Sequence, residues 1–428
     1  MIHPVSPSLS PGIHRGFCGK TMVSLLLVWS LLGLNGPLAA VARGAETMGV
    51  GVLLPLTGPM ALFGKAAKQS YEMAMDQIND QGGIQGKTLR FLFADTKSQA
   101  QRGKQLAVDW ITQGKVVALA GGMDPPVASA MAEVSVLHAF PVVIHASMTD
   151  QRAIIACDPG PDHDQRSECP VFRISPAMEE SMVTFEDFLT RVVRPQSMAI
   201  LYEDSPFGAD AMTQLEKIAK RLGIPDPYGI VFASNTTAII HAWDQVRPRG
   251  FDLIVMVSST RSAERLVLGS MSRNLNPKLF VGIGRGFNHP RFMENVGKAG
   301  EKLMTVTVWH PGIPPMADQN YADLFLERTN TESQVDGAQA YATAWVIKDG
   351  LERAVSLSKE DIINALVKTE LPTILGPVTF TRQGDQVNQN PSKIYLAQWL
   401  GNKRWIVWPQ NLASRGYVYP IDWIRERR

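Results

Sequence analysis

Apolar runs typical of buried strands alternate with helical periodicity from about residue 50 onwards. In the first unit, the run 50–55, the turn 56–59 and the stretch 66–79 predict a strand, a loop and a helix. Further strands are expected at 88–95, 116–120 and 142–144, with helices at 99–113 and 126–138. Strands that are apolar on both faces and are each followed by a helix are typical of a parallel sheet covered on both sides.

The same alternation begins again after a polar segment near residues 158–168. Expected strands lie at 198–202, 228–233, 251–257 and 278–281, and expected helices at 179–193, 209–222, 239–246 and 263–272. Two helical patterns, 336–354 and 359–368, are followed by hairpin-like patterns at 376–380, 394–399 and 405–408. The sequence therefore predicts an α/β fold with two doubly wound, Rossmann-like lobes in series.

The N-terminal segment differs in composition from the rest of the chain. A Pro/Ser-rich stretch precedes the apolar run 22–34 and the small-residue motif Ala-Val-Ala at 40–42, an order typical of a secretory signal peptide. The run is short for a membrane span, and an uncleaved anchor is the alternative. Cys18 precedes the run, which argues against a lipoprotein anchor. We expect residues 1–42 to be removed on export to the periplasm.

The charge balance excludes partners that are bound mainly through charge. The chain has 42 Lys and Arg against 40 Asp and Glu, and the expected cut removes two basic residues and no acidic one. No basic face of the kind that contacts phosphates is present, so we expect no nucleic-acid partner.

Two cysteines remain after the cut, Cys157 and Cys169, with a polar loop between them. A disulfide that closes such a loop in an oxidising compartment would contribute about 3 kcal/mol. The alternative is a metal site made of neighbouring side chains, although paired Cys/His spacing is missing. Those side chains are Asp162, His163, Asp164 and Glu168.

Motifs for catalysis or cofactor binding are missing from the sequence. It has no Gly-x-Ser-x-Gly elbow, no P-loop and no His-x-x-x-His pair, and the glycines at 282–286 have the wrong spacing for a dinucleotide loop. We interpret 282–286 as a tight turn after a strand. The sequence thus predicts neither an enzyme nor a bound cofactor or metal.

Loops at the expected carboxyl ends of the strands are the candidate ligand site. In open parallel sheets, ligands bind beyond these ends, where helix N-termini present free N–H groups. Four such loops carry small polar or aromatic residues, namely 57–59, 121–124, 145–149 and 204–208. On facing edges of two lobes, they would form a cleft that closes on a small molecule.

Several stretches resemble, in order along the chain, the leucine/isoleucine/valine-type periplasmic binding proteins of ABC transporters. They are 50–64 (VGVLLPLTGPMALFG), 78–86 (INDQGGIQG), 94–96, 143–150 (VIHASMTD), 172–173, 199–208 (AILYEDSPFG), 252–257 and 376–385 (GPVTFTRQGD). The resemblance implies a type I periplasmic binding protein fold, in which the chain crosses three times between two lobes. We expect crossings near residues 171, 310 and 376. The N-terminal lobe would then be 46–171 plus 311–376, and the C-terminal lobe 172–310 plus 377–428.

The resemblance also implies which residues bind the ligand. In this family, small hydroxyl residues and backbone N–H groups of the first lobe hold a carboxylate, and an acidic side chain helps to hold an ammonium group. A backbone carbonyl and a Thr hydroxyl also help to hold the ammonium group. Ser147 and Thr149 match the paired small residue and the Thr of the family's VIxASxTD stretch, and Phe207 matches an aromatic that packs over the ligand. Glu301 resembles the acidic residue. The candidate loops add Thr57, Gly122, Asp124 and Asp204.

Two residues depart from the family pattern. Asp124 stands where the family usually offers Ser or Thr, and an ionised carboxylate there would repel a ligand carboxylate. Either Asp124 points away, or the ligand presents a cation or an amide donor. His145 is also unusual, and would either sense ligand charge or cap the strand.

These observations predict a monomeric, exported solute-binding protein that delivers an amino acid, an amide or a similar polar solute to ABC permease subunits. Urea and polyamine-like ligands stay open. The alternative is a periplasmic sensor that reports ligand occupancy to a membrane receptor or regulator. A third hypothesis, an enzyme acting on a bound amide, lacks a visible nucleophile and base.

Overall fold

The computed structural model describes residues 46–145, 157, 168–224, 226–258, 262–289, 291–313, 320–383 and 386–426. The chain divides into two units, 1–44 and 45–428, and the fold below is that of the second. The expected signal peptide lies outside the described residues. Within the described part of the chain, no helix has both the length and the apolar character needed to cross a membrane.

The first of two seven-stranded sheets has the strand order β13-β14-β5-β4-β3-β1-β2. All its pairs are parallel except β13 with β14. Its strands are β1 (Thr47–Leu54), β2 (Thr88–Asp95), β3 (Ala118–Gly121), β4 (Val142–Ile144), β5 (Val171–Arg173), β13 (Thr381–Gln383) and β14 (Gln386–Gln389). Its helices are α1 (Ala61–Asp80), α2 (Ala100–Thr112), α3 (Pro125–His138), α10 (Val335–Arg353) and α11 (Lys359–Val367).

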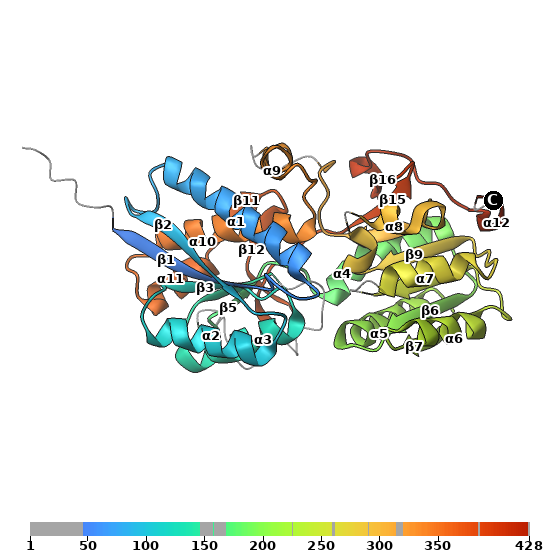
Figure 1. Cartoon of the computed structure of the whole chain (residues 1–428), viewed down its shortest axis with the longest axis horizontal. Helices are drawn as coiled ribbons and strands as arrows, with labels where there is room; N and C mark the ends of the chain where they lie inside the picture. Colours follow the sequence, from blue (N-terminus) through green and yellow to red (C-terminus); the bar gives the residue numbers. More distant parts are fainter. Residues whose placement is uncertain are drawn as a thin grey trace, which may run out of the picture. The chain divides into compact units, whose positions relative to one another are not determined.

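Helices cover both faces of this sheet, and the strand sequences show why. Val52 and Leu54 of β1 belong to one apolar cluster, which includes Tyr71 of α1 and Tyr341 of α10. Leu53 between them belongs to another, with side chains of α2 and α3. Successive side chains of a strand point to opposite faces, so a continuous apolar run has to be covered twice. Figure 1 shows α1 and α10 on one side of β1 and β3, and α2 and α3 on the other.

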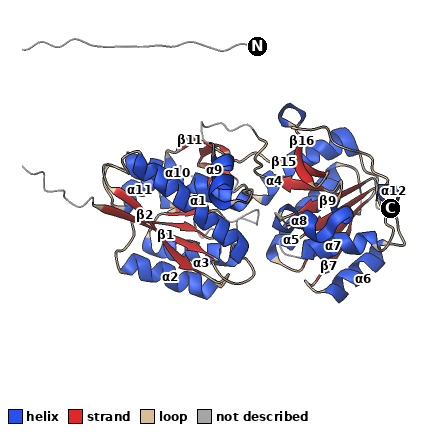
Figure 2. Ribbon diagram, turned by 45° about the horizontal axis from the view of Figure 1, so that its top comes forward, coloured by secondary structure: helices blue, strands red, loops and turns tan. Residues whose placement is uncertain are grey.

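The second sheet repeats this arrangement with the strand order β16-β15-β10-β9-β8-β6-β7. Its strands are β6 (Met198–Glu203), β7 (Tyr228–Phe232), β8 (Leu253–Val257), β9 (Leu279–Ile283), β10 (Met304–Thr307), β15 (Tyr395–Leu400) and β16 (Lys403–Trp408). Its helices are α4 (Met178–Phe188), α5 (Pro206–Arg221), α6 (Thr236–Val246), α7 (Ser262–Met271) and α8 (Phe292–Val296). Every residue of the central strand β8 is buried. In Figure 2 helices flank the strands of each sheet.

The remaining elements connect or extend these two layers. Helix α4 continues as a π-helical turn, η3 (Leu189–Val193). Three short 3-10 helices are η4 (Arg285–Asn288), η5 (Gly297–Gly300) and η6 (Gln410–Leu412). Helices α9 (Tyr321–Thr329) and α12 (Trp423–Glu426) and the antiparallel pair β11 (Glu370–Thr373) and β12 (Gly376–Thr379) complete the described elements.

The structure confirms the predicted α/β class with two doubly wound sheets. Strands β2 and β4 have the predicted bounds, and α1 begins five residues earlier than the predicted start at 66. The short strands β5, β10, β11, β13 and β14 were not predicted, because they combine a length of three or four residues with polar side chains, whereas all three residues of β4 are apolar.

One predicted lobe boundary is wrong. The segment 377–428 was assigned to the second lobe, but β13 and β14 lie in the first sheet, where Gln389 pairs with Arg173 of β5. The side chain of Asn388 donates to the carbonyl of Cys169, and that of Asn390 donates to the carbonyl of Ile174. These buried amides bind the segment to β5, so the chain returns to the second sheet only between β14 and β15.

The junction between β6 and α5 is a tight turn that positions Phe207. Ser205 caps the helix, its hydroxyl oxygen accepting a hydrogen bond from the backbone N–H of Gly208 at 3.1 Å. A Cβ atom on Gly208 would lie 1.9 Å from the carbonyl oxygen of Glu203. The helix can approach the strand this closely only because residue 208 has no side chain.

We therefore expect Gly208→Ala to lower the free energy of unfolding by about 1–3 kcal/mol, because the methyl group forces the helix away from the strand. The measurement is urea unfolding at pH 7. Gly416→Ala is the matched control, since a Cβ there meets no atom within 4 Å. Equal stability of the two variants would contradict the close approach.

Candidate functional site

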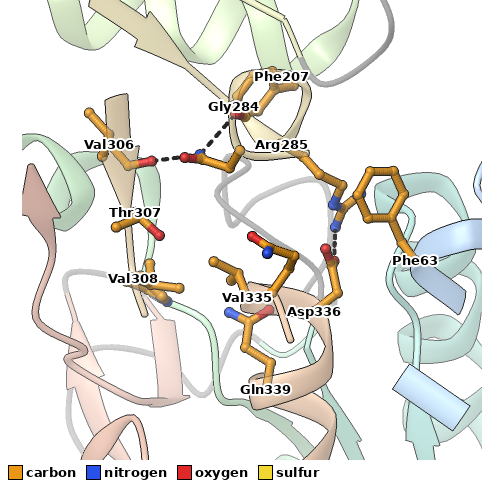
Figure 3. A pocket seen from close by; sticks show the side chains of 13 residues that line it. Phe63, Phe207, Gly284, Arg285, Val306, Thr307, Val308, Val335, Asp336 and Gln339 are labelled. Carbon is orange, nitrogen blue, oxygen red and sulfur yellow. Dashed lines mark hydrogen bonds and ion pairs between the residues drawn. The ribbon is translucent and has the colours of Figure 1, made fainter. Parts of the chain in front are cut away.

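The candidate site is a pocket formed by residues from both halves of the second unit. Segments associated with the first sheet contribute Phe63 of α1 and the N-terminal part of α10. Segments of the second sheet contribute Phe207, the turn 284–288 and the end of β10. Pro176 and Gln334 lie between elements and complete the lining. The pocket encloses about 40 Å³ and is shown in Figure 3.

Part of the pocket wall is apolar. Phe207 is 6% exposed, and the rings of Phe63 and Phe207 line the pocket together with three valines. The valines are Val306, Val308 and Val335. Such a wall favours the hydrocarbon part of a ligand, because burial removes apolar surface from water.

A buried ion pair crosses the pocket. Nη2 of Arg285 lies 2.8 Å from Oδ1 of Asp336, and the two side chains are 9% and 4% exposed. Arg285 follows strand β9, whereas Asp336 lies in the first turn of α10, where the helix dipole favours a negative charge. The guanidinium carbon is also 5.3 Å from the ring centroid of Phe63. Arg285 thus joins the second sheet's turn to two helices of the first half (Figure 3).

A second arginine fixes the orientation of two amide side chains that line the pocket. Arg404 of β16 donates to Oδ1 of Asn288 at 2.6 Å and to Oε1 of Gln334 at 3.0 Å. The Asn288 amide nitrogen donates to the carbonyls of Gly284 and Val306. Burial lowers the pKa of Arg404 to about 10, so it stays charged at neutral pH. Both pocket amides therefore have a defined orientation.

Gln339 lies one turn after Asp336 on the same face of α10 and is 1% exposed. Its Nε2 donates to the hydroxyl of Ser175 at 2.8 Å. Its Oε1 has no hydrogen-bond partner within the described part of the chain. A buried acceptor without a partner is unfavourable, which marks this oxygen as a place for a ligand donor.

Two further titratable groups lie within the electrostatic reach of Arg285. Burial raises the pKa of Asp124, the N-cap residue of α3, although the charge of Arg285 opposes the shift. Burial, and to a smaller extent Arg285, lowers the pKa of His145 to about 3. The imidazole is fully buried and is therefore neutral at pH 7.

The structure places the predicted site residues in several different surroundings. Phe207 lines the pocket, and its contact with a ligand stays a prediction. Gly122 is a buried turn residue with φ +65° that packs against Ala128, and Asp124 lies near Arg285 without lining the pocket. Ser147 and Thr149 lie outside the described residues, so their assignment stays a prediction.

Three further predicted residues do not line this pocket. The Thr57 hydroxyl donates to Asp95 at 2.6 Å, and so fixes the loop after β1. Asp204 is exposed. The Glu301 carboxylate accepts hydrogen bonds from the backbone N–H groups of Gly401 and Asn402, and thereby holds the turn between β15 and β16. The Thr57 hydroxyl and the Glu301 carboxylate thus hold turns or loops in place, which sequence position alone does not distinguish from a ligand contact.

A second cavity of about 500 Å³ shares Phe63 with the pocket. The loop that Thr57 holds contributes three of its residues, 58–60, and the second half contributes Arg265 and His289 among others. Thr57 therefore affects this region indirectly, through the position of its loop.

The pocket residues that the sequence interpretation missed are Arg285, Asp336, Gln339, Asn288 and Gln334. Arg285 lies in the glycine-rich turn 282–286, which was interpreted as structural only. Its single signal was a charged residue directly after a buried strand. Within the described residues, no group of three or more His, Cys, Asp or Glu could hold a metal ion. Asp162, His163 and Asp164 lie outside them.

We expect the buried His145 to make the protein less stable in acid. The unfolded chain takes up a proton near the ordinary imidazole pKa of about 6.5, whereas the folded protein does so only near 3, so stability falls as the pH drops through this interval. Between pH 7 and pH 4.5 the loss from this one group is about 2–3 kcal/mol. In His145→Phe, the difference between unfolding free energies at the two pH values should be smaller by that amount. An unchanged difference would contradict a neutral, buried imidazole.

Comparisons with known proteins agree with this fold. The sequence profile of a periplasmic binding protein family matches residues 47–404. Leu/Ile/Val-binding protein homolog 3 of Brucella melitensis is 24% identical over 354 residues, which cover 78% of this chain and 88% of that protein.

Solved structures share the fold at lower sequence identity. The branched-chain amino acid transporter substrate binding protein LivJ of Streptococcus pneumoniae, in complex with isoleucine, superimposes with a TM-score of 0.69 at 17% identity, over 88% of this chain and 100% of LivJ. A solute binding protein of an ABC transporter from Rhodopseudomonas palustris, in complex with 3,4-dihydroxy benzoic acid, gives a TM-score of 0.67 at 16% identity, over 82% of this chain and 93% of that chain.

These neighbours confirm the predicted type I fold, and they are binding proteins of transporters rather than enzymes. Because the family profile covers most of the sequence, the chain belongs to the periplasmic binding protein family.

Proposed function

We propose that the protein is an exported solute-binding protein of an ABC importer that captures an amino acid or a related amide in the pocket around Arg285 and Asp336. The observation that carries this proposal is the composition of the pocket, in which an apolar wall adjoins a buried pair of opposite charges. An amino acid with an apolar side chain has the same combination of groups. Two of the similar proteins support it: the relative from Brucella is named as a homolog of Leu/Ile/Val-binding proteins, and LivJ was solved in complex with isoleucine.

Hinge closure accounts for how such a ligand enters. The pocket encloses about 40 Å³, room for only a few water molecules. Its lining comes from segments of both sheets, and the chain passes between the sheets three times. Separation of two lobes about these connections would open the pocket, and closure would bury the ligand. The first lobe would contain β13 and β14, which corrects the boundary predicted at 376.

The proposed location is the periplasm, reached by cleavage of a signal peptide near Ala42. A partner permease would then receive the ligand from the closed, monomeric protein. The cysteine pair supports an oxidising compartment, since the Cα atoms of Cys157 and Cys169 lie 5.6 Å apart, a typical separation for bridged cysteines.

If this pair is bridged, the protein purified from the periplasm will have no free thiol. Alkylation of the unfolded protein should modify no cysteine before reduction and two after it, as mass spectrometry would show. The double variant Cys157→Ser and Cys169→Ser should lose about 3 kcal/mol of stability, because the unfolded chain regains the loop entropy. Modification of both thiols without reductant would exclude the bridge.

For ligand binding, we expect a thermal-shift screen of amino acids and amides to find a stabilising solute. At 100 times its dissociation constant, a ligand adds about 2.7 kcal/mol of stability. Phe207→Ala should weaken the affinity for that solute by roughly 10- to 100-fold in calorimetry, because the ring buries apolar surface against the ligand. Phe251→Ala is the matched control, since Phe251 stacks on Tyr228 and does not line the pocket. A flat screen would contradict the proposed ligand class.

A further inference from the structure

We propose that the pocket selects a zwitterion and binds it in a defined orientation, with the ligand carboxylate on Arg285 and the ligand ammonium group on Asp336 and Gln339. This inference rests on the proposed function and adds to it the charge and the direction of the ligand. Three observations carry it: the position of two acceptors on α10, the position of the guanidinium, and the balance of buried charge.

The two acceptors form a site for a cation. Asp336 and Gln339 are three residues apart on α10 and lie on one face of the helix, 3% and 1% exposed. The Gln339 amide nitrogen is used by Ser175, which leaves Oε1 as the buried acceptor without a partner within the described residues. An ammonium group carries several N–H donors and can reach a carboxylate and an amide oxygen together.

Arg285 supplies the hydrogen-bond donors for the ligand carboxylate. The guanidinium of Arg285 carries five N–H donors in a planar arrangement that matches a carboxylate. Its position is fixed by Asp336 at 2.8 Å and by the ring of Phe63. Figure 3 shows Arg285 and Asp336 directed toward each other, with Gln339 on the next turn of the helix that carries Asp336.

Charge balance favours a zwitterion over a ligand with a single charge. A ligand that separates Arg285 from Asp336 removes one charged contact from each residue. It has to replace both contacts, because the loss of a buried ion pair is costly. A zwitterion supplies both replacements and adds no net charge. A monocarboxylate supplies a partner only to Arg285 and brings a third carboxylate near Asp336 and Asp124. These two carboxylates already repel each other, since the charge of Asp336 helps to raise the pKa of Asp124. The neutral His145 contributes no positive charge to offset it.

This orientation is the reverse of the one that the family resemblance implied, in which the first lobe holds the carboxylate. Here the cationic side chain follows β9 of the second sheet, and the acidic side chain lies on a helix that covers the first sheet. A bound zwitterion would bridge the two halves, replacing one direct ion pair by two contacts. The charges of Arg285, of Asp336 and of the two charged groups of the ligand would thereby couple ligand binding to closure.

The first experiment uses the wild-type protein and ligands that share one side chain. Calorimetry compares leucine with 4-methylpentanoate, which lacks the ammonium group, and with leucinamide, which lacks the carboxylate. The corresponding phenylalanine series and benzoate complete the panel. We expect the preferred amino acid to bind at least about 10-fold more tightly than either of its derivatives, because each derivative loses one charged hydrogen-bonding group.

The second experiment assigns each charge to its residue. Arg285→Gln should abolish the preference for the amino acid over its amide. Asp336→Asn should abolish the preference for the amino acid over its deaminated acid. Gln339→Met should weaken amino-acid binding, whereas Gln339→Glu should strengthen binding of the cationic amide. Matched controls are Arg291→Gln and Asp349→Asn, which alter ion pairs with Glu294 and Arg353 outside the pocket. If a single variant does not fold, the double variant Arg285→Met and Asp336→Leu removes both buried charges together and should abolish the preference for the zwitterion.

The outcomes separate this inference from the proposed function. Tighter binding of the amino acid, lost selectively in the two charge variants, supports it. Equal affinity for the deaminated acid, for benzoate or for the amide overturns the zwitterion assignment and leaves a solute-binding protein. Unchanged selectivity in Arg285→Gln and Asp336→Asn also overturns it. If no member of the panel binds, the proposed ligand class fails together with the inference.

Discussion

Parallel strands that are buried on both faces can present functional side chains only beyond their ends, and this constraint shapes the protein. In both sheets the central strands are covered by helices on each side, so their side chains are used for packing. The pocket is accordingly built where the second sheet's strands end: Phe207 after β6, Arg285 after β9 and Val308 after β10. The helix that completes it, α10, begins at the same place and contributes its N-terminal turn. Sequence-distant segments meet there because the carboxyl ends of parallel strands share one edge.

The buried ion pair is the costly element of this arrangement. Arg285 and Asp336 are almost completely removed from water, and their opposite charges compensate each other. Ion pairs of this kind contribute little net stability, which makes them suited to exchange with a charged ligand. The surrounding groups are fixed as well: Arg404 holds the two amides of Asn288 and Gln334, and burial keeps His145 neutral.

The errors of the sequence interpretation have a common physical cause. Thr57, Asp204 and Glu301 were chosen because polar residues at loop tips are candidates for ligand contact. Two of them instead hydrogen-bond to protein groups elsewhere in the fold, Thr57 to Asp95 and Glu301 to the turn between β15 and β16, and Asp204 is exposed. A hydroxyl or carboxylate has the same sequence signature whether it caps a turn or binds a solute. The boundary at 376 failed for a related reason, since β14 joins the first sheet through buried amides whose partners are more than 200 residues away.

The sequence by itself determined the two α/β sheets, the strands β2 and β4 and the long helices, because hydrophobic periodicity and turn residues are local properties. Tertiary structure alone decided that Arg285 meets Asp336 and that Gln339 lines the same pocket, its buried oxygen having no partner among the described residues. It also decided that the tail strands return to the first sheet. Each of these contacts joins segments that are distant in the sequence, and their pairing follows from strand order and helix packing, which no local pattern encodes.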